Sequence, residues 1–197
     1  MKVEERKFVY RVFLSFVIFV SILLIFLGGS SGSTGNAILN VTSNVSLLNF
    51  YSISFSENLS SGINFGEILN LPAVNVNATA NYISSNNGTG YYIAVSGDGN
   101  VNVDFCIKAS GDLESVAGDV LGLGNESYSN STYTNETLPP PIGLSLTTSF
   151  VKSGENIPSD GTGVNYYRFW LDVPSGQPAG AYNNTVTFKA VPTTSSC

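Results

Sequence analysis

The chain has 197 residues, of which 43% are hydrophobic and only 11% are charged. This length fits one folded core plus an appendage, and the apolar content is too high for a disordered chain. The net charge is −6, and four cations and two carboxylates before residue 12 contribute +2 to it, which leaves −8 for the remainder. Nucleic acid is therefore excluded as a partner, because too few cations remain to neutralise phosphates.

The first 35 residues predict a secretory signal peptide. A basic stretch ends at Arg11, an apolar run covers residues 12–27, and small residues follow it. The run is shorter than the roughly 20 residues that a membrane-spanning helix needs, which favours cleavage over a permanent anchor. Cleavage after Ser33 or Ala37 has small residues at the recognition positions. We expect an extracellular protein that meets the membrane only through its leader, before cleavage.

The two cysteines, Cys106 and Cys197, predict an intrachain disulfide in an exported protein. Two thiols in a chain without histidine make a poor metal site, so no metal is expected.

The strand pattern begins directly after the leader, in residues 36–47. Odd positions are apolar except for Ser43, and the even positions between Asn40 and Ser46 are polar. This alternation predicts an extended strand with one buried face. The buried face consists of Ala37, Leu39, Val41, Val45 and Leu47.

Residues 48–197 show further short runs of alternation but no helical period. They predict an all-β fold, most simply an immunoglobulin-like β-sandwich of about eight strands. Residues 91–96 and 101–107 are expected to form a hairpin around the Gly-Asp-Gly-Asn turn. Residues 110–141 lose the alternation and predict a solvated excursion without a core of its own. The other runs lie at residues 51–55, 74–82, 144–150, 165–173 and 182–190.

Nine Asn-x-Ser/Thr triplets predict dense N-glycosylation, about twice the four or five that chance would give. Those on strands fall at polar positions and the others fall in predicted turns or loops, so all nine are expected to face solvent. The acceptors are Asn40, Asn44, Asn58, Asn77, Asn87, Asn125, Asn130, Asn135 and Asn183.

Catalytic chemistry is not indicated. The absence of histidine excludes the usual triads and proton shuttles, so no enzyme activity, catalytic residue or cofactor is expected. Asp98, Asn100, Asn102 and Asp104 have the spacing of a calcium loop, but the required glycine and final glutamate are missing. Asp112 and Glu114 lack the aromatic subsite of a glycosidase.

Two other groups of residues are better explained by structure. The aromatic run Tyr166, Tyr167, Phe169 and Trp170 is expected to pack rather than to bind sugar, with Trp170 on the face opposite Tyr167. An isopeptide crosslink from a lysine buried beside an asparagine and a carboxylate stays an open alternative, because the sequence does not choose the three residues.

A family resemblance adds to this interpretation. Residues 166–191, YYRFWLDVPSGQPAGAYNNTVTFKAV, resemble the closing hairpin of exported archaeal β-sandwich proteins. With the leader, the acceptor triplets, the lack of histidine and the terminal cysteine, the chain resembles subunits of the archaeal thread filament. That resemblance implies glycosylated sandwiches joined head to tail, each lending its N-terminal strand to the next.

The sequence therefore predicts a subunit of an extracellular cell-surface filament, whose partners are further copies of itself and N-linked glycans. Residues 1–35 would be the signal peptide, 36–47 the donor strand and 48–197 the sandwich. A strand that folds back in cis is the alternative to donation. A monomeric, membrane-anchored or surface-lattice glycoprotein is the alternative function, and a secreted hydrolase is a more distant one.

Overall fold

The computed structural model describes residues 45–46, 48–83, 87–134 and 143–197. The chain separates into two compact units, Met1–Ser46 and Leu47–Cys197, and all the strands of the described residues lie in the second. The predicted signal peptide and residues 36–44 and 47 of the predicted donor strand lie outside the described residues.

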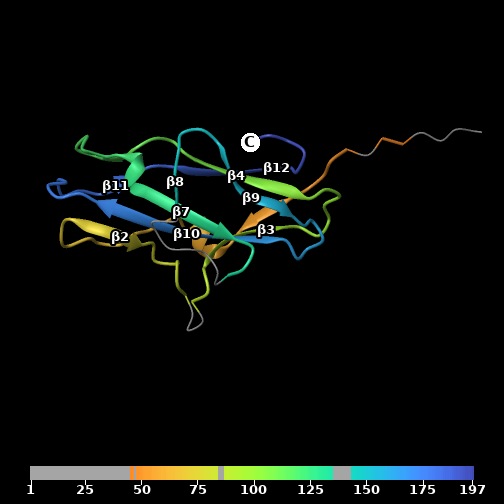
Figure 1. Cartoon of the computed structure of the whole chain (residues 1–197), viewed down its shortest axis with the longest axis horizontal. Helices are drawn as coiled ribbons and strands as arrows, with labels where there is room; N and C mark the ends of the chain where they lie inside the picture. The colour runs from red at the N-terminus through yellow and green to blue at the C-terminus, as the bar shows by residue number, and fades with distance from the viewer. Residues whose placement is uncertain (1–44, 47, 84–86, 135–142) are drawn as a thin grey trace, which may run out of the picture. The chain divides into compact units, whose positions relative to one another are not determined.

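The larger sheet of the second unit is antiparallel and is built around one long strand (Figure 1). Its order is β1-β3-β10-β7-β8, and β2 pairs with the second half of β10, on the side where β3 pairs with the first half. The strands are β1 (Ile53–Phe55), β2 (Ala73–Asn77), β3 (Tyr91–Val95), β7 (Glu126–Ser131), β8 (Leu144–Ser145) and β10 (Val164–Val173).

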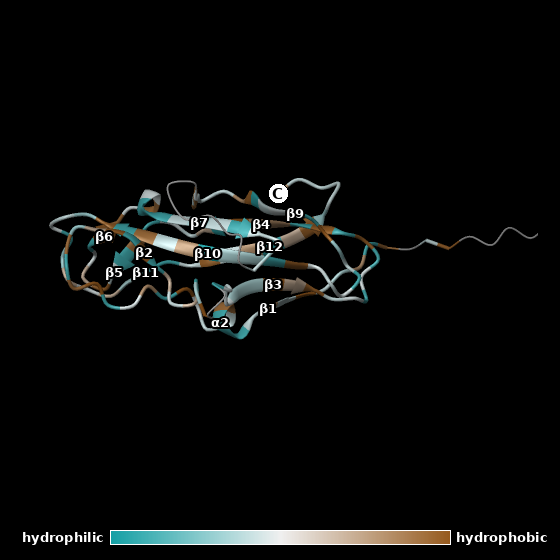
Figure 2. Cartoon of the chain, turned by 60° about the horizontal axis from the view of Figure 1, so that its bottom comes forward, coloured by the Kyte–Doolittle hydropathy of each residue, from teal (hydrophilic) through white to brown (hydrophobic). Residues whose placement is uncertain are grey.

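Two smaller antiparallel sheets complete the unit. One has the order β12-β4-β9, from β4 (Val103–Ala109), β9 (Val151–Ile157) and β12 (Val186–Pro192). The other has the order β11-β5-β6, from β5 (Leu113–Ser115), β6 (Val120–Leu121) and β11 (Tyr182–Asn183). Two short helices, α2 (Glu57–Ser60) and the 3₁₀ helix η1 (Leu123–Asn125), are the helical elements of the described residues. In Figure 2, α2 and β1 lie beside β3.

The core lies between the large sheet and the β12-β4-β9 sheet. Alternate residues of β10 point inward, so Tyr167 and Phe169 are fully buried against Phe105 and Ile107 of β4. A second, smaller cluster joins Leu171 and Val173 at the end of β10 to the third sheet. This arrangement confirms the predicted all-β class and its antiparallel sandwich of sheets.

Two sequence predictions about this region are wrong. β3 and β4 do not form a hairpin, because β3 pairs with β1 and β10 whereas β4 pairs with β12 and β9. The segment 110–141 is not a coreless excursion either. Within its described part, β7 pairs along six residues of β10, and its Tyr128 is fully buried.

Candidate functional site: an open groove beside a free strand edge

The surface of the second unit has an apolar groove of about 1120 Å³. It runs along the first residues of β12 and continues over the second core cluster. Phe55 and Leu69 on its border are 44% and 85% exposed, so much of its apolar surface is uncovered. The large apolar side chains of its lining are those of Phe55, Leu59, Ile63, Phe65, Ile68, Leu69, Leu71, Leu113, Leu121, Leu171, Val173, Tyr182, Val186 and Phe188.

One wall of the groove is the edge strand β12, which pairs only with β4 among the described residues. Ser110 N donates to Thr185 O at 2.8 Å, and Thr193 N donates to Asn102 O at 3.2 Å. These bonds fix the odd residues of β12 as those that bond to β4. In an antiparallel ladder the residues between them direct N–H and C=O the other way. Val186 and Phe188 therefore present their backbone groups along the groove.

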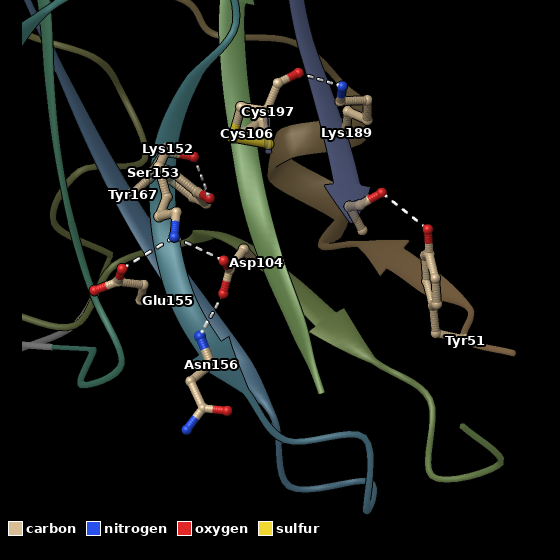
Figure 3. The surroundings of a disulfide bond; sticks show 11 residues. Tyr51, Asp104, Cys106, Lys152, Ser153, Glu155, Asn156, Tyr167, Lys189 and Cys197 are labelled. Carbon is tan, nitrogen blue, oxygen red and sulfur yellow. Dashed lines mark hydrogen bonds and ion pairs between the residues drawn. A yellow bond between two sulfur atoms is a disulfide. The ribbon is translucent and has the colours of Figure 1, made fainter. Parts of the chain in front are cut away.

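The opposite wall begins with β1, another edge strand. Ser96 N donates to Ser52 O and Ser56 N donates to Tyr92 O, both at 2.9 Å, so Ile53 directs its backbone groups away from β3. The two edges approach each other at one end of the groove. There the Phe55 and Phe188 rings meet edge to face at 5.7 Å, and Tyr51 Oη donates to Ala190 O at 3.1 Å (Figure 3).

The chain enters the second unit at the end of the sandwich opposite to the groove. Asn100 holds this entry: its Nδ2 donates to Leu48 O at 2.9 Å, and its Oδ1 accepts from Phe50 N at 2.8 Å. Asn100 lies near the end of β12, because Asn102, two residues later, accepts a hydrogen bond from Thr193 directly after that strand. The groove lies beside the start of β12. The four-residue step from Phe188 to the end of β12 corresponds to about 13 Å.

A single buried ionisable side chain, Glu126, lines the groove among the described residues. It is 2% exposed, and its Oε2 accepts from Asn184 Nδ2 at 2.9 Å. Burial raises the pKa of the Glu126 carboxyl above its usual range, and the hydrogen bond from Asn184 opposes this only in part.

Replacing Glu126 with Gln should flatten part of the stability profile against pH. A carboxyl whose pKa is raised on folding contributes stability that is fully present below its unfolded pKa of about 4.5 and is lost as pH rises through its folded pKa. Each unit of that shift corresponds to about 1.4 kcal/mol. Urea unfolding at several pH values should show the wild type losing stability over this window relative to Glu126→Gln. Parallel profiles would contradict the assignment.

The predicted disulfide is confirmed. Cys106 and Cys197 are joined, with their Cα atoms 5.7 Å apart, on the outer face of β4 (Figure 3). Lys189 Nζ donates to Cys197 O at 2.6 Å and so ties the last residue to β12 as well. The C-terminal segment is therefore fixed to β12, the strand that borders the groove.

A lysine and two carboxylates meet next to this disulfide (Figure 3). Lys152 Nζ lies 2.8 Å from Asp104 Oδ2 and 3.0 Å from Glu155 Oε1. The hydrogen bonds that Lys152 donates, first to Asp104 and then to Glu155, raise the pKa of its amine. Because a protonated amine has no lone pair to attack a carboxyl carbon, this arrangement favours an ion pair over an isopeptide crosslink.

The remaining residues of the calcium-like spacing have separate partners. Asp98 N and its Oδ2 both bond Ser96 Oγ, and Asn102 Nδ2 donates to Asn156 Oδ1. Across the described residues no three His, Cys, Asp or Glu side chains gather as metal ligands. Asp112 Oδ1 accepts from Leu123 N at 2.7 Å, and Glu114 lies opposite Asn183 in the third sheet.

The aromatic run of β10 packs as its alternation predicts. Tyr167 and Phe169 face the core, whereas Trp170 lies on the outer face, is 2% exposed and donates from Nε1 to Asn77 Oδ1 at 2.9 Å. Tyr166 stands against Tyr92 at 5.6 Å.

The predicted glycan acceptors differ in accessibility. Asn58, Asn77, Asn87 and Asn183 are exposed, and Asn183 borders the groove. Asn125 and Asn130 are half-buried, and the Asn125 amide donates to Gly122 O at 2.9 Å. Asn40, Asn44 and Asn135 lie outside the described residues.

Sequence reasoning did not find the groove, Glu126 or Asn184. No known family model matches the chain, and no curated protein has significant similarity to it. The described residues contain no helix long and apolar enough to cross a membrane.

Proposed function

We propose that this protein is a structural subunit of an extracellular filament in which residues 36–47 of one copy fill the groove of the next. The observation that carries the proposal is the free edge of β12 beside an uncovered apolar groove. A strand laid there would bond the outward backbone groups of Val186 and Phe188 and cover the half-buried side chains of the core.

The predicted donor strand has the composition that this groove requires. Its apolar face offers Leu39, Val41, Val45 and Leu47, and burying each such side chain contributes about 1.5–3 kcal/mol. Unpaired strand edges and uncovered apolar surface favour association with another strand. Together these terms favour a junction that resists dissociation.

The entry point of the chain favours donation between copies over insertion in cis. Leu48 and Phe50 are held by Asn100 at the end of the sandwich away from the groove. To insert in cis, the strand would have to reverse at these residues and pass the contact between Tyr51 and Ala190. A strand that continues away from its own domain reaches the groove of a neighbour without either obstacle.

Replacing Val41 with Asp tests the proposal in the mature full-length chain. A carboxylate at this position would be buried unpaired in the groove, so fibre yield should fall at least about tenfold. Ile38→Asp is the matched control, because position 38 lies on the opposite face and leaves both nearby acceptor triplets intact. Negative-stain microscopy and sedimentation measure the fibres.

The proposal fails if the native protein is a compact monomer that forms no fibres. It also fails if both aspartate variants assemble as the wild type does. A mature N-terminus that retains residues 12–27 would instead support the membrane-anchored glycoprotein.

We further propose that the exposed acceptor asparagines carry glycans and so supply the solubility that the low charge does not. Occupancy should be high at Asn77 and Asn183 and lowest among the described acceptors at Asn125, whose amide nitrogen is already bonded to Gly122 O. Glycopeptide mapping of the native protein measures this order. Two or fewer occupied sites in the whole chain would refute dense glycosylation.

A further inference from the structure

The groove has a polar position between two apolar ones. Along its β12 side, Phe188 and Val186 pack against the main core. Two residues before Val186, Asn184 turns its amide to Glu126 at 2.9 Å. Beyond it, Tyr182 packs against the second core cluster.

Glu126 sits in the floor of the groove at this polar position. It lies opposite Leu171 on the paired strand β10, on the inward side of the sheet. Its side chain is buried at 2% exposure, and Asn184 is its hydrogen-bond donor from the groove wall. A carboxyl group has more acceptor sites than one amide donor fills, so Glu126 is able to accept a second hydrogen bond from a hydroxyl or amide group.

The inward face of the predicted donor strand has the same pattern. Its last five odd positions are two apolar residues, then Ser43, then two apolar residues. When Ser43 is placed beside Asn184, Val41 and Val45 fall on either side of it, whichever direction the strand runs. A shift by two residues would put a valine against Glu126 and the serine hydroxyl in an apolar position.

Building on the proposed strand donation, we infer that Glu126 and Asn184 fix the register of the inserted strand by hydrogen bonding the Ser43 hydroxyl of the neighbouring copy. Burial of apolar side chains alone would allow several registers of the inserted strand. Only one register places the serine hydroxyl at the polar position of the groove, so the groove selects that register.

Disulfide trapping in fibres of the mature full-length chain tests the register. Position 186 should crosslink to position 41 if the donated strand is antiparallel to β12, or to position 45 if it is parallel. We expect one of the double variants Val41→Cys/Val186→Cys and Val45→Cys/Val186→Cys to give a ladder of covalent oligomers on non-reducing gels. The variant Ser43→Cys/Val186→Cys should give none, and a ladder from it would overturn the register.

A second measurement does not depend on new cysteines. Thr and Val have the same shape, so Ser43→Thr keeps the hydroxyl while Ser43→Val removes it. Subunits should leave Ser43→Val fibres in guanidinium about tenfold faster than Ser43→Thr fibres, since removing one partner of a buried hydrogen bond costs about as much as a factor of ten represents. In a Glu126→Leu background this difference should vanish.

Equal release rates from Ser43→Val and Ser43→Thr fibres would overturn the inference while leaving strand donation in place. If the wild-type chain formed no fibres, or trapped position 186 only within single chains, donation itself would fail and the register inference with it.

Discussion

Replacing Cys106 and Cys197 together by serine should lower the free energy of unfolding by about 4–5 kcal/mol. The disulfide joins residues 91 positions apart, so it removes much of the conformational freedom of the unfolded chain. It also anchors the segment that follows the edge strand β12. Denaturant unfolding of the mature full-length chain measures the loss, and it should appear as a lower transition midpoint.

The reduced wild type is the matched control for this variant, because it lacks the bond but keeps both sulfur atoms. Reduced wild type and the double serine variant should unfold at the same denaturant concentration. A loss below about 1 kcal/mol in both would show that the C-terminal segment adds little to the fold. Because β12 borders the groove, the proposed strand donation also predicts fewer fibres from this variant.

The strand most readily predicted from the sequence was β10. Its inward residues Tyr167, Phe169, Leu171 and Val173 are apolar or aromatic at every second position, and all four are buried. The disulfide was equally predictable, since two cysteines in a chain that is predicted to be exported have one intrachain pairing to make. The alternation in residues 36–47 has the same form as that of β10, and residues 36–44 and 47 lie outside the described residues.

The strands β7 and β9 escaped prediction because polar or small residues occupy several of their buried positions. Glu126 of β7 is held by Asn184, and Ser153 of β9 bonds Tyr167 Oη at 3.1 Å. At Gly154 a Cβ atom would come within 2.9 Å of the Asn165 side chain, so glycine is required by close packing. A pattern of alternating hydrophobic residues does not reveal these buried polar contacts, because the tertiary structure brings their partners together.

The assignment of strands to sheets was also beyond the sequence pattern. β3 and β4 alternate in the same way and are joined by a turn-like segment, so a hairpin was the natural expectation. In the structure that segment crosses from one sheet to the other, and its Asn100 bonds the chain at Leu48 and Phe50. The groove lies between β1 and the start of β12, which are edge strands of two different sheets.

Arg168 provides the last prediction, on the face of β10 opposite to the core. Its side chain is 3% exposed and lies over the Tyr82 ring at 4.2 Å. Nε donates to Asn81 O at 3.0 Å and to Thr89 Oγ1 at 2.8 Å, and Nη2 donates to the carbonyl oxygens of Asn87 and Thr134. One guanidinium thus joins three separate stretches of backbone to the central strand.

Arg168→Met should therefore lower the free energy of unfolding by about 3–5 kcal/mol. Methionine fills much of the same space but leaves buried acceptors without a donor, at a cost of about 1–3 kcal/mol each. Lys108→Met is the matched control: Lys108 lies over the Phe150 ring at 4.8 Å on a half-exposed site, and losing that contact should cost less than about 1 kcal/mol. Both variants are compared by denaturant unfolding, and hydrogen exchange should show faster opening around Thr89 in Arg168→Met alone. Equal losses in the two variants would mean that the guanidinium contributes only its charge and not the anchoring of these backbone segments.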